Sequence, residues 1–346
     1  MKKIKVGCFF GGKSSEYEVS LKSAEAIIKN MNPKKYEIIK IGITKDGDFF
    51  LYEGSINKIA NNEWLKEKLI PVSISTNSSS SGLINLNDHT IIQYDVAFPI
   101  LHGTNGEDGR IQALFEITNI PYVGCDMLSS DMCMDKDIAH KIVQLIGIKV
   151  PKSYLYHKDD EYMLFEKKIK TLTPPLYVKP VNGGSSIGIT KIKEISKLQE
   201  AIDFALRYDN KVLVEEHVEG VEVGCAIMGN KNLVIGTVDE VKLNVDFFDF
   251  DQKYNLHKVK IGPKNDVDEV VLTEIKETAI QIYQALNCKG LARIDMFLTK
   301  EMNIVFNEVN TMPGFTENSR FPNMLKNIGY TFEEIVDFLI NEAMNG

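Results

Sequence analysis

Two short segments near the carboxyl end of the chain carry side chains whose types and spacing suit metal chemistry. Arg293 and Asp295 flank an isoleucine, and Glu308 and Asn310 flank a valine. Because side chains alternate along a strand, a hairpin turning at 301–302 places Asp295 opposite Glu308 and Arg293 opposite Asn310. Facing carboxylates destabilise a sheet unless a cation lies between them. An all-oxygen set of Asp, Glu and Asn suits Mg²⁺ or Mn²⁺ better than zinc.

The same alternation also fits a solvated strand face whose carboxylates meet lysines, because apolar residues occupy the positions in between. The segment 311–322, which follows directly and contains a Pro-Gly pair, favours the metal site. A glycine-bearing turn beside metal ligands can aim backbone N–H groups at an oxyanion. We therefore predict a metal site with an anion-binding turn next to it.

A second candidate site is the glycine- and serine-rich loop 182–188, which lies between two predicted strands and follows Lys179. Glycines let backbone N–H groups approach a phosphate, and serine hydroxyls add donors. The loop is not a Walker A loop, since no Lys-Ser or Lys-Thr pair follows its last glycine. A plain glycine-rich hairpin turn is the alternative. Lys136 and Lys179 are further phosphate candidates, although a single lysine is more often a surface residue.

Three more side chains lie where functional groups are common. Glu215 ends a predicted strand and Glu222 follows Gly220, so both carboxylates can hydrogen-bond a ribose, although strand-end polarity also explains them. His102 lies in a glycine-rich loop after an apolar strand, and such loops often carry function.

The elements that position these residues begin with a β-loop-α-β order. Apolar runs predict strands over 4–10 and 36–44, and the pattern between them predicts a helix over 18–30. This order is typical of a parallel sheet that binds its ligand at the carboxyl ends of the strands. The same half of the chain predicts a strand at 91–101, a helix at 110–118 and a short strand at 121–124.

The rest of the chain alternates helices and strands. The expected helices cover 131–146, 195–207 and 266–286, and the expected strands cover 176–179, 212–215, 221–229, 232–242, 291–299 and 304–310. Residues 243–265 are aromatic, charged and irregular, and this segment is too long for a plain connector. Such loops are commonly functional lids or disordered segments.

Composition limits the class of protein. A chain of 346 residues corresponds to two or three domains, and 44% hydrophobic with 25% charged residues excludes a disordered or fibrous protein. The net charge of −8 argues against a nucleic-acid-binding protein. No apolar run is long enough to span a bilayer, and the N-terminus lacks a signal-peptide cleavage site, so we expect no membrane association. Five scattered cysteines without CxxC spacing indicate reduced thiols and a cytoplasmic protein.

Six motifs taken together resemble the ATP-grasp superfamily and, more closely, the D-alanine–D-alanine ligases. They occur in the family's order at 11–21, 102–109, 134–136, 179–188, 293–295 and 307–316. The resemblance implies an α/β fold (α+β in the ATP-grasp part), with a Rossmann-like N-terminal domain followed by a two-lobed ATP-grasp domain. It implies a substrate domain over 1–125, a central lobe over 126–212, and a C-terminal lobe over 213–346 that carries the metal site and the lid loop 243–265.

The resemblance further implies an ATP-dependent ligase that phosphorylates D-alanine and joins it to a second substrate. The implied ATP-binding residues are Lys136, Lys179, Gly184, Ser185, Ser186, Glu215 and Glu222. The implied ligands of two Mg²⁺ ions, or of Mn²⁺, are Asp295, Glu308 and Asn310. The implied catalytic residues are Glu16, Ser185, Tyr254, Arg293 and Gly314, and the implied substrate-binding residues are His102, Lys253, Ser319 and Arg320.

Within this scheme, Glu16 holds the ammonium of the first D-alanine and forms a hydrogen-bonded trio with Ser185 and Tyr254 of the lid. Arg293 and the N–H of Gly314 stabilise the tetrahedral oxyanion. Two departures from the family's pattern concern the nucleotide site. Glu216 stands where a lysine is frequent, and Asn182-Gly183 replace a more usual Arg-Glu pair.

The second substrate depends on the residues around Ser319, which by resemblance receives its carboxylate. Arg320 stands where D-alanine–D-alanine ligases usually carry Leu, and a guanidinium offers a polar donor to a hydroxyl-bearing substrate. Segment 246–254 resembles the D-alanine–D-serine ligases of the VanG type, and it keeps Tyr254 where D-lactate ligases carry His. We predict D-serine as the second substrate, with D-alanine also accepted. A D-alanine–D-alanine ligase with a carboxylate-paired Arg320 is the alternative.

The resemblance also implies a homodimer that makes the dipeptide terminus of peptidoglycan precursors and belongs to cell-wall synthesis or vancomycin resistance. Two other classes stay open: a different ATP-grasp carboxylate–amine ligase, and a nucleotide-binding regulator without activity. A dinucleotide-dependent dehydrogenase is excluded, because no GxGxxG follows the first strand.

Overall fold

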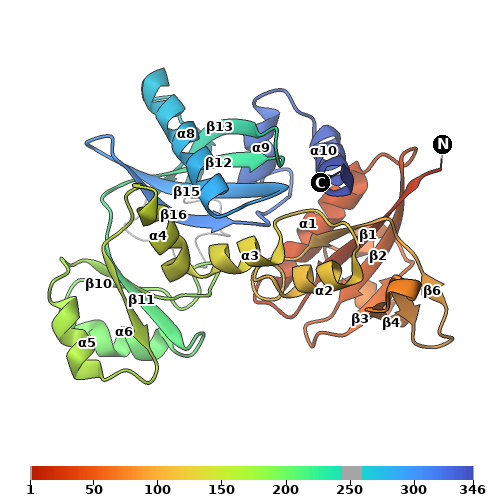
Figure 1. Ribbon diagram of the computed structural model, residues 1–346, viewed down its shortest axis with the longest axis horizontal. Helices are drawn as coiled ribbons and strands as arrows, with labels where there is room; N and C mark the ends of the chain where they lie inside the picture. Colours follow the sequence, from red (N-terminus) through yellow and green to blue (C-terminus); the bar gives the residue numbers. More distant parts are fainter. Residues whose placement is uncertain (1, 244–258, 346) are drawn as a thin grey trace.

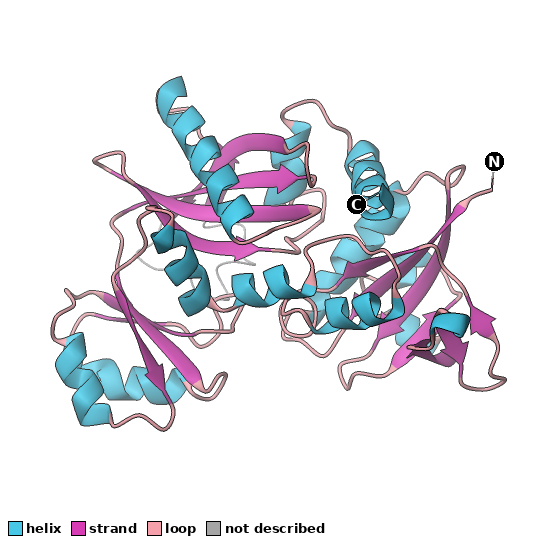
Figure 2. Ribbon diagram, viewed as in Figure 1, coloured by secondary structure: helices cyan, strands magenta, loops and turns pink. Residues whose placement is uncertain are grey.

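The computed structural model describes residues 2–243 and 259–345 of the chain. Its elements form three sheets with helices packed on them, and this architecture confirms the predicted α/β class. Figure 1 shows the seven-stranded N-terminal sheet on one side of the molecule and the other two sheets on the opposite side, with α3 (Met127–Met134) running between. Figure 2 shows α8 (Glu269–Ala285) lying across the five-stranded sheet.

The N-terminal sheet has the strand order β6-β5-β4-β3-β2-β1-β7. Its strands are β1 (Ile4–Gly11), β2 (Tyr36–Ile43), β3 (Phe49–Tyr52), β4 (Leu69–Ser75), β5 (Gly82–Asn85), β6 (Ile91–Ile92) and β7 (Val96–Ile100). α1 (Tyr17–Asn30) connects β1 to β2, and β1 is parallel to both β2 and β7. α2 (Arg110–Thr118) follows β7. The predicted β-loop-α-β unit is confirmed.

The remaining strands of this sheet are antiparallel, so the expectation of a parallel sheet is wrong for β3 to β6. The reason is the short connection after β2. The N–H of Thr44 donates to the carbonyl of Asp48 over 2.9 Å, and Gly47 has a φ of 103°. A turn this tight reverses the chain, whereas a parallel crossover needs a dozen or more residues. The predicted strand 121–124 is reduced to one bridge between Ala97 and Tyr122.

The four-stranded sheet has the order β10-β9-β11-β8. Its strands are β8 (Ser153–His157), β9 (Leu176–Pro180), β10 (Thr190–Ile192) and β11 (Lys211–Glu216). α5 (Tyr162–Ile169) and α6 (Leu198–Ala205) share a hydrophobic core with the alternate strand residues Leu176, Val178 and Val212. Lys179 and Glu215 therefore lie on the other face of the sheet.

The five-stranded sheet has the order β14-β13-β12-β15-β16. Its strands are β12 (Gly220–Met228), β13 (Val234–Leu243), β14 (Val259–Pro263), β15 (Leu291–Thr299) and β16 (Ile304–Asn310). β14 lies inside the segment expected to be irregular, where it pairs with β13. The β15–β16 hairpin pairs Arg293 with Asn310 and Asp295 with Glu308, which confirms the predicted register. An irregularity after Asp295 shifts the later pairs by one residue.

The single helix predicted over 131–146 is two helices, α3 and α4 (Lys136–Leu145). The break occurs at Asp135, whose backbone is extended and whose carboxylate accepts the N–H of Ile138 over 3.0 Å. Asp135 also pairs with Lys211 of β11. The carboxylate thus caps a new helix, and Lys136 becomes the first residue of that helix instead of a residue in the middle of one.

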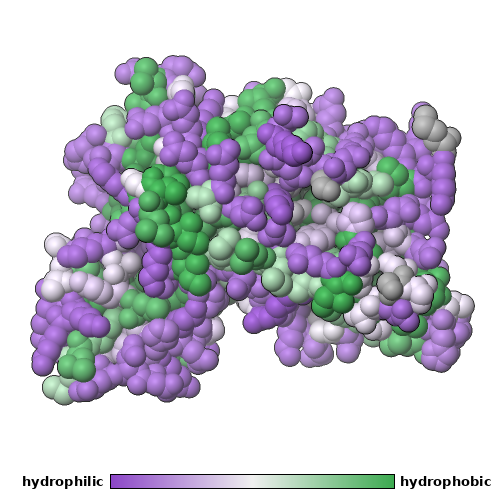
Figure 3. Space-filling model, viewed as in Figure 1, coloured by the Kyte–Doolittle hydropathy of each residue, from purple (hydrophilic) through white to green (hydrophobic). Residues whose placement is uncertain are grey.

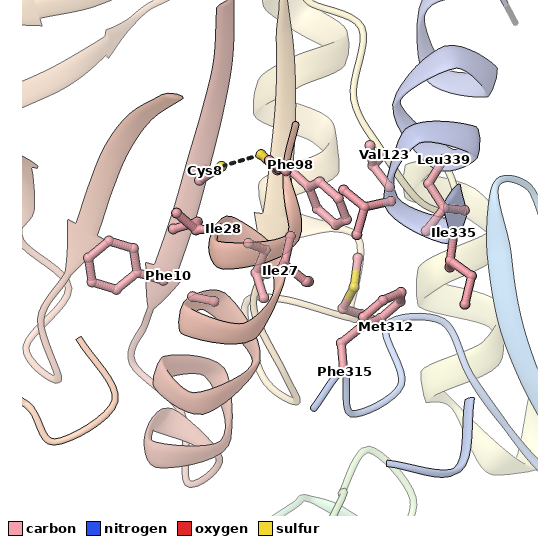
Figure 4. Packing of buried hydrophobic residues seen from close by; sticks show 14 of the residues in the cluster. Cys8, Phe10, Ile27, Ile28, Phe98, Val123, Met312, Phe315, Ile335 and Leu339 are labelled. Carbon is pink, nitrogen blue, oxygen red and sulfur yellow. Dashed lines mark hydrogen bonds between the residues drawn. The ribbon is translucent and has the colours of Figure 1, made fainter. Parts of the chain in front are cut away.

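The carboxyl-terminal helices α9 (Arg320–Lys326) and α10 (Phe332–Asn345) share one hydrophobic core with the N-terminal sheet. Figure 4 shows Met312 and Phe315, from the turn after β16, among Ile27, Phe98 and Leu339 of this core. The domain boundaries given above remain a prediction. All five cysteines are free and buried, as expected. Within the described residues, no helix combines the length and the apolar character needed to cross a membrane.

Candidate active site

The predicted metal ligands meet on one face of the five-stranded sheet. Asp295 on β15 lies across from Glu308 on β16. Arg293 forms a bidentate ion pair with Asp295, in which Nε lies 2.9 Å from Oδ1 and Nη2 lies 2.7 Å from Oδ2. Nδ2 of Asn310 donates to the same Oδ2 over 2.9 Å. Burial alone would lower the pKa of Arg293, but the charge and hydrogen bonds of Asp295 together with the charge of Asp239 raise that pKa above its usual value. The guanidinium therefore stays charged beside the predicted metal site.

This donor set fits Mg²⁺ when the metal arrives with a phosphate. In the part of the chain that the structure describes, no group of three His, Cys, Asp or Glu side chains is arranged to hold a metal ion by itself. The β15–β16 hairpin offers two carboxylates and one amide, from Asp295, Glu308 and Asn310. Mg²⁺ is usually bound in proteins through one or two carboxylates plus substrate phosphates. The three residues therefore suit a metal that is completed by a nucleotide.

Lys136 links the metal strands to the glycine-rich loop. Its Nζ lies 3.6 Å from Oε2 of Glu308 and donates to the carbonyl of Gly183 over 2.5 Å. Burial lowers the pKa of Lys136, and the charge of Glu308 opposes this shift. The ammonium of Lys136 can replace its hydrogen bond to the Gly183 carbonyl with a stronger, charge-assisted bond to a phosphate oxygen.

Lys179 and Glu215 form a buried ion pair on the face of the four-stranded sheet that points away from α5 and α6. Nζ of Lys179 lies 2.6 Å from Oε1 of Glu215, and both side chains are almost fully buried. The second oxygen, Oε2, is buried and has no hydrogen-bond partner among the described residues. Buried polar atoms are rarely left unpaired. Oε2 is therefore an acceptor suited to a ligand N–H, such as the amino group of a nucleobase.

The loop 182–188 has a backbone suited to anions. Ser185 and Ser186 both have positive φ angles, 52° and 57°, and Gly188 has a φ of 75°. Left-handed residues are costly outside glycine, and successive N–H groups in such turns form anion-binding concavities. The hydroxyl of Ser185 donates to the carboxylate of Glu16, so the loop of the central lobe contacts the N-terminal domain here. Two members of the predicted trio are thus in contact.

Six of the predicted site residues line a small cavity of about 40 Å³: Glu16, Lys136, Gly184, Ser185, Glu308 and Asn310. It is lined by Glu16, Glu107, Cys133, Met134, Lys136, residues 183–185 and residues 308–311. The volume holds a few waters but no triphosphate, so the loop must move when a nucleotide enters. A larger pocket of about 500 Å³ lies between residues 144–152 and 216–218. Its lining includes Glu216, next to Glu215 of the predicted nucleotide site, whereas the smaller cavity is lined by Glu16, Lys136 and Glu308.

His102 is buried and Glu107 is half-buried beside the turn that follows β16. Nδ1 of His102 lies 2.7 Å from the carbonyl oxygen of Met312, and Oε1 of Glu107 accepts the N–H of Met312 over 2.9 Å. Burial, and then the charge of Glu16, raise the pKa of Glu107 to about 8. Glu107 lies in the motif 102–109 but was assigned no role from the sequence; a carboxylate five residues after a site histidine was the available signal.

Arg320 lies among three carboxylates. Its Nε and Nη2 bind both oxygens of Asp239 at 2.8 and 2.7 Å, and its Nη1 lies 2.7 Å from Glu222 and 3.4 Å from Asp295. Burial would lower the pKa of Arg320, but Asp295 and Asp239 raise it well above its usual range. A methyl group on Gly224 would collide with this guanidinium, so the glycine makes the arrangement possible. Asp239 was missed by the sequence analysis, since an Asp-Glu pair inside a predicted strand belongs to no motif that indicates a function.

Three further predictions concern the second-substrate region. Ser319 lies beside Gly314 in the turn that leads to α9, and its hydroxyl accepts the N–H of Thr316 over 2.9 Å. Ser319 precedes Arg320 directly, and Arg320 is the first residue of α9. Lys253 and Tyr254 lie outside the described residues.

Two lobes that direct lysines and carboxylates toward each other, closed by an N-terminal α/β layer, define the class of ATP-grasp ligases. The family models described as D-ala D-ala ligase N-terminus and C-terminus match residues 5–125 and 142–341. The chain therefore belongs to the D-alanine–D-alanine ligase family, and it is an ATP-dependent carboxylate–amine ligase.

Individual relatives agree with this assignment. The chain is 42% identical over 354 residues to the vancomycin B-type resistance protein VanB of Enterococcus faecalis, covering 99% of both chains. It is 41% identical over 362 residues to the D-alanine–D-alanine ligase of Acetivibrio thermocellus, covering 99% of this chain and 96% of the relative. The crystal structure of VanG D-Ala:D-Ser ligase from Enterococcus faecalis superposes with a TM-score of 0.92 and 48% identity, covering 99% of this chain and 100% of that one.

Proposed function

We propose that this ligase joins D-alanine to D-serine and also accepts a second D-alanine. The observation that carries the proposal is Arg320 next to Ser319, because its guanidinium is a donor suited to a hydroxyl group. The 48% identity to VanG D-Ala:D-Ser ligase supports the same substrate. A D-alanine–D-alanine ligase is the second candidate, favoured by the three carboxylates that already engage Arg320.

In the first step of the proposed reaction, the carboxylate of D-alanine attacks the γ-phosphorus of ATP, ADP leaves, and D-alanyl phosphate forms. Glu16 binds the substrate ammonium, and Lys136 and Lys179 neutralise phosphate oxygens, which favours the approach of two anions. Mg²⁺ bound at Asp295 and Glu308 would supply further charge neutralisation. Glu215 and Glu222 position the adenosine part of ATP.

In the second step, the neutral amine of the second substrate attacks the carbonyl carbon of D-alanyl phosphate and a C–N bond forms. The bond between this carbon and the phosphate oxygen breaks, and inorganic phosphate leaves. Arg293 and the N–H of Gly314 stabilise the oxyanion, and Ser319 binds the carboxylate of the incoming substrate. The acyl phosphate is sensitive to water, so Lys253 and Tyr254 of the lid would close over it. The product would form the terminus of peptidoglycan precursors, and the 42% identity to VanB supports a role in vancomycin resistance.

The test is phosphate release from Mg-ATP with identification of the product by mass spectrometry. D-alanine is supplied alone, with D-serine, and with D-lactate. We expect turnover to rise with D-serine and D-alanyl-D-serine to be the main product. If D-serine has no effect and only D-alanyl-D-alanine forms, the second candidate is correct. No phosphate release under any of these conditions would contradict both.

We also propose that the enzyme is a homodimer. Figure 3 shows hydrophobic residues gathered over α3 and α4 on the face in view. Leu145, Leu128 and Ile138 are 86%, 55% and 40% exposed there. Exposed apolar patches of this kind mark association surfaces.

Leu145→Glu is expected to convert the dimer into a monomer, because a charge in an apolar interface loses its hydration without gaining a partner. Light scattering coupled to size-exclusion chromatography measures the mass. The control is Ile117→Glu, which changes another exposed apolar residue, 61% exposed and located on α2. A wild-type monomer, or a Leu145→Glu dimer, would refute this interface.

A further inference from the structure

We propose that Ser23, His102 and Glu107 form a clamp that positions the turn 312–315, and that Ser23 and Glu107 thereby act as positioning residues for the second step. The proposal rests on the role proposed for Gly314, which lies inside this turn. The clamp residues belong to α1 and to the loop after β7, whereas the turn follows β16. Residues of the N-terminal sheet region therefore position the backbone turn that follows β16, which is the turn proposed to bind the oxyanion.

The first half of the clamp holds Met312. Glu107 accepts the N–H of Met312 at Oε1 over 2.9 Å, and its other oxygen accepts the N–H of Gly103 over 2.8 Å. Nδ1 of His102 lies 2.7 Å from the carbonyl oxygen of Met312. A carbonyl oxygen can only accept, so Nδ1 carries the proton. Both backbone polar groups of Met312 are thus bound by side chains, one from the buried His102 and one from the half-buried Glu107.

The second half holds Phe315 through Ser23. The N–H of Phe315 donates to Oγ of Ser23 over 3.2 Å, and Nε2 of His102 lies 2.9 Å from the same Oγ. A neutral histidine protonated on Nδ1 accepts at Nε2, so the Ser23 hydroxyl donates to His102. Burial lowers the pKa of His102, which favours this neutral form. The hydrogen bonds that run from Phe315 through Ser23 and His102 to Met312 then share one direction, and the N–H of Met312 donates onward to Glu107.

Side-chain packing reinforces the clamp. Met312 and Phe315 are buried in the core formed by α1, β7 and α10, as Figure 4 shows. Pro313 and Gly314 lie between these two anchors. An oxyanion donor works only when its N–H is held close to the productive geometry. The clamp supplies that constraint from both sides of Gly314.

The test is Ser23→Ala in the full chain, with the two steps measured separately. The first step is followed by positional isotope exchange in ¹⁸O-labelled ATP with D-alanine alone, and it should stay within about twofold of wild type. Dipeptide formation should fall about tenfold or more, because the oxyanion donor is no longer held. ADP released per dipeptide should rise. A general loss of structure would lower both steps together.

The matched control is Ser20→Ala. Ser20 lies one turn earlier on α1 and is equally buried, and its hydroxyl binds the N–H of Gly11 over 2.8 Å and the carbonyl of Ile100. It has no bond to the turn 312–315 among the hydrogen bonds of the described residues. We expect Ser20→Ala to leave the ratio of ADP to dipeptide unchanged. Equal uncoupling by both variants would overturn the clamp.

Hydrogen exchange keeps the proposal testable without any activity. The amides of Met312 and Phe315 should exchange faster in Ser23→Ala than in wild type, and Ser20→Ala should not have this effect. Unchanged exchange in Ser23→Ala would overturn the clamp even in an active ligase. Glu107→Ala provides a second variant if Ser23→Ala does not fold, because it removes the acceptors of the N–H groups of Gly103 and Met312, and the amide of Met312 should then exchange faster. A wild-type protein that makes no dipeptide would instead overturn the proposed function alone.

Discussion

Glu308→Gln is expected to lower phosphate release from Mg-ATP at least about a hundredfold, which corresponds to about 2.7 kcal/mol of lost transition-state stabilisation. Glu308 faces Asp295 across the hairpin, and its carboxylate also lies 3.6 Å from the ammonium of Lys136. Glutamine keeps the shape but removes the charge that attracts a divalent cation. Turnover should recover partly at high Mg²⁺, because the remaining ligands and the nucleotide still bind the metal.

The fold should survive this substitution. Asp295 stays paired with Arg293 in the variant, and the glutamine oxygen can still accept from the ammonium of Lys136, so we expect only a small loss in the free energy of unfolding of the metal-free protein. The control is Glu301→Gln, which changes an exposed glutamate in the turn of the same hairpin. Rates are measured across a Mg²⁺ titration, and thermal melts check the fold. Wild-type turnover of Glu308→Gln at all Mg²⁺ concentrations would rule out the metal assignment.

Arg320→Leu is expected to change both the substrate preference and the stability of the enzyme. The sequence predicted a loss of D-serine preference. The structure adds a loss of stability, because leucine would leave Asp239, Glu222 and Asp295 without their shared cation. Breaking a buried ion pair by removing one partner costs about 3–5 kcal/mol. We expect a cost of that order in the free energy of unfolding without ligand, and a smaller one with Mg-ATP.

Two measurements separate these effects. Urea unfolding of Arg320→Leu, Asp239→Asn and the double variant gives the coupling between the pair, and the double variant should be less destabilised than the sum of the single ones. Competition between D-serine and D-alanine gives the selectivity, and the ratio of products should shift about tenfold toward D-alanyl-D-alanine. Arg320→Lys keeps the charge and serves as the control. A changed stability with an unchanged ratio would mean that Arg320 is structural only.

The β15–β16 hairpin shows what could be predicted from local sequence. Alternation and a short turn were sufficient to place Asp295 across from Glu308 and Arg293 across from Asn310. The prediction succeeded because side-chain period and hairpin pairing act between residues close in sequence. The same reasoning failed at Asp135, where it predicted one continuous helix. There a helix-capping carboxylate that also pairs with Lys211, 76 residues away, ends one helix and starts another.

The sequence by itself therefore determined part of the strand pattern, the register of the metal-site hairpin, the family and the set of candidate residues. Only the tertiary structure decided their partners: Asp239 meets Arg320 across 81 residues, and His102 and Ser23 reach the turn after β16 across 210 and 292 residues. Such contacts depend on how three separate sheets pack against one another. No local propensity or spacing specifies that packing, because the burial of each sheet's apolar face decides which distant segments meet.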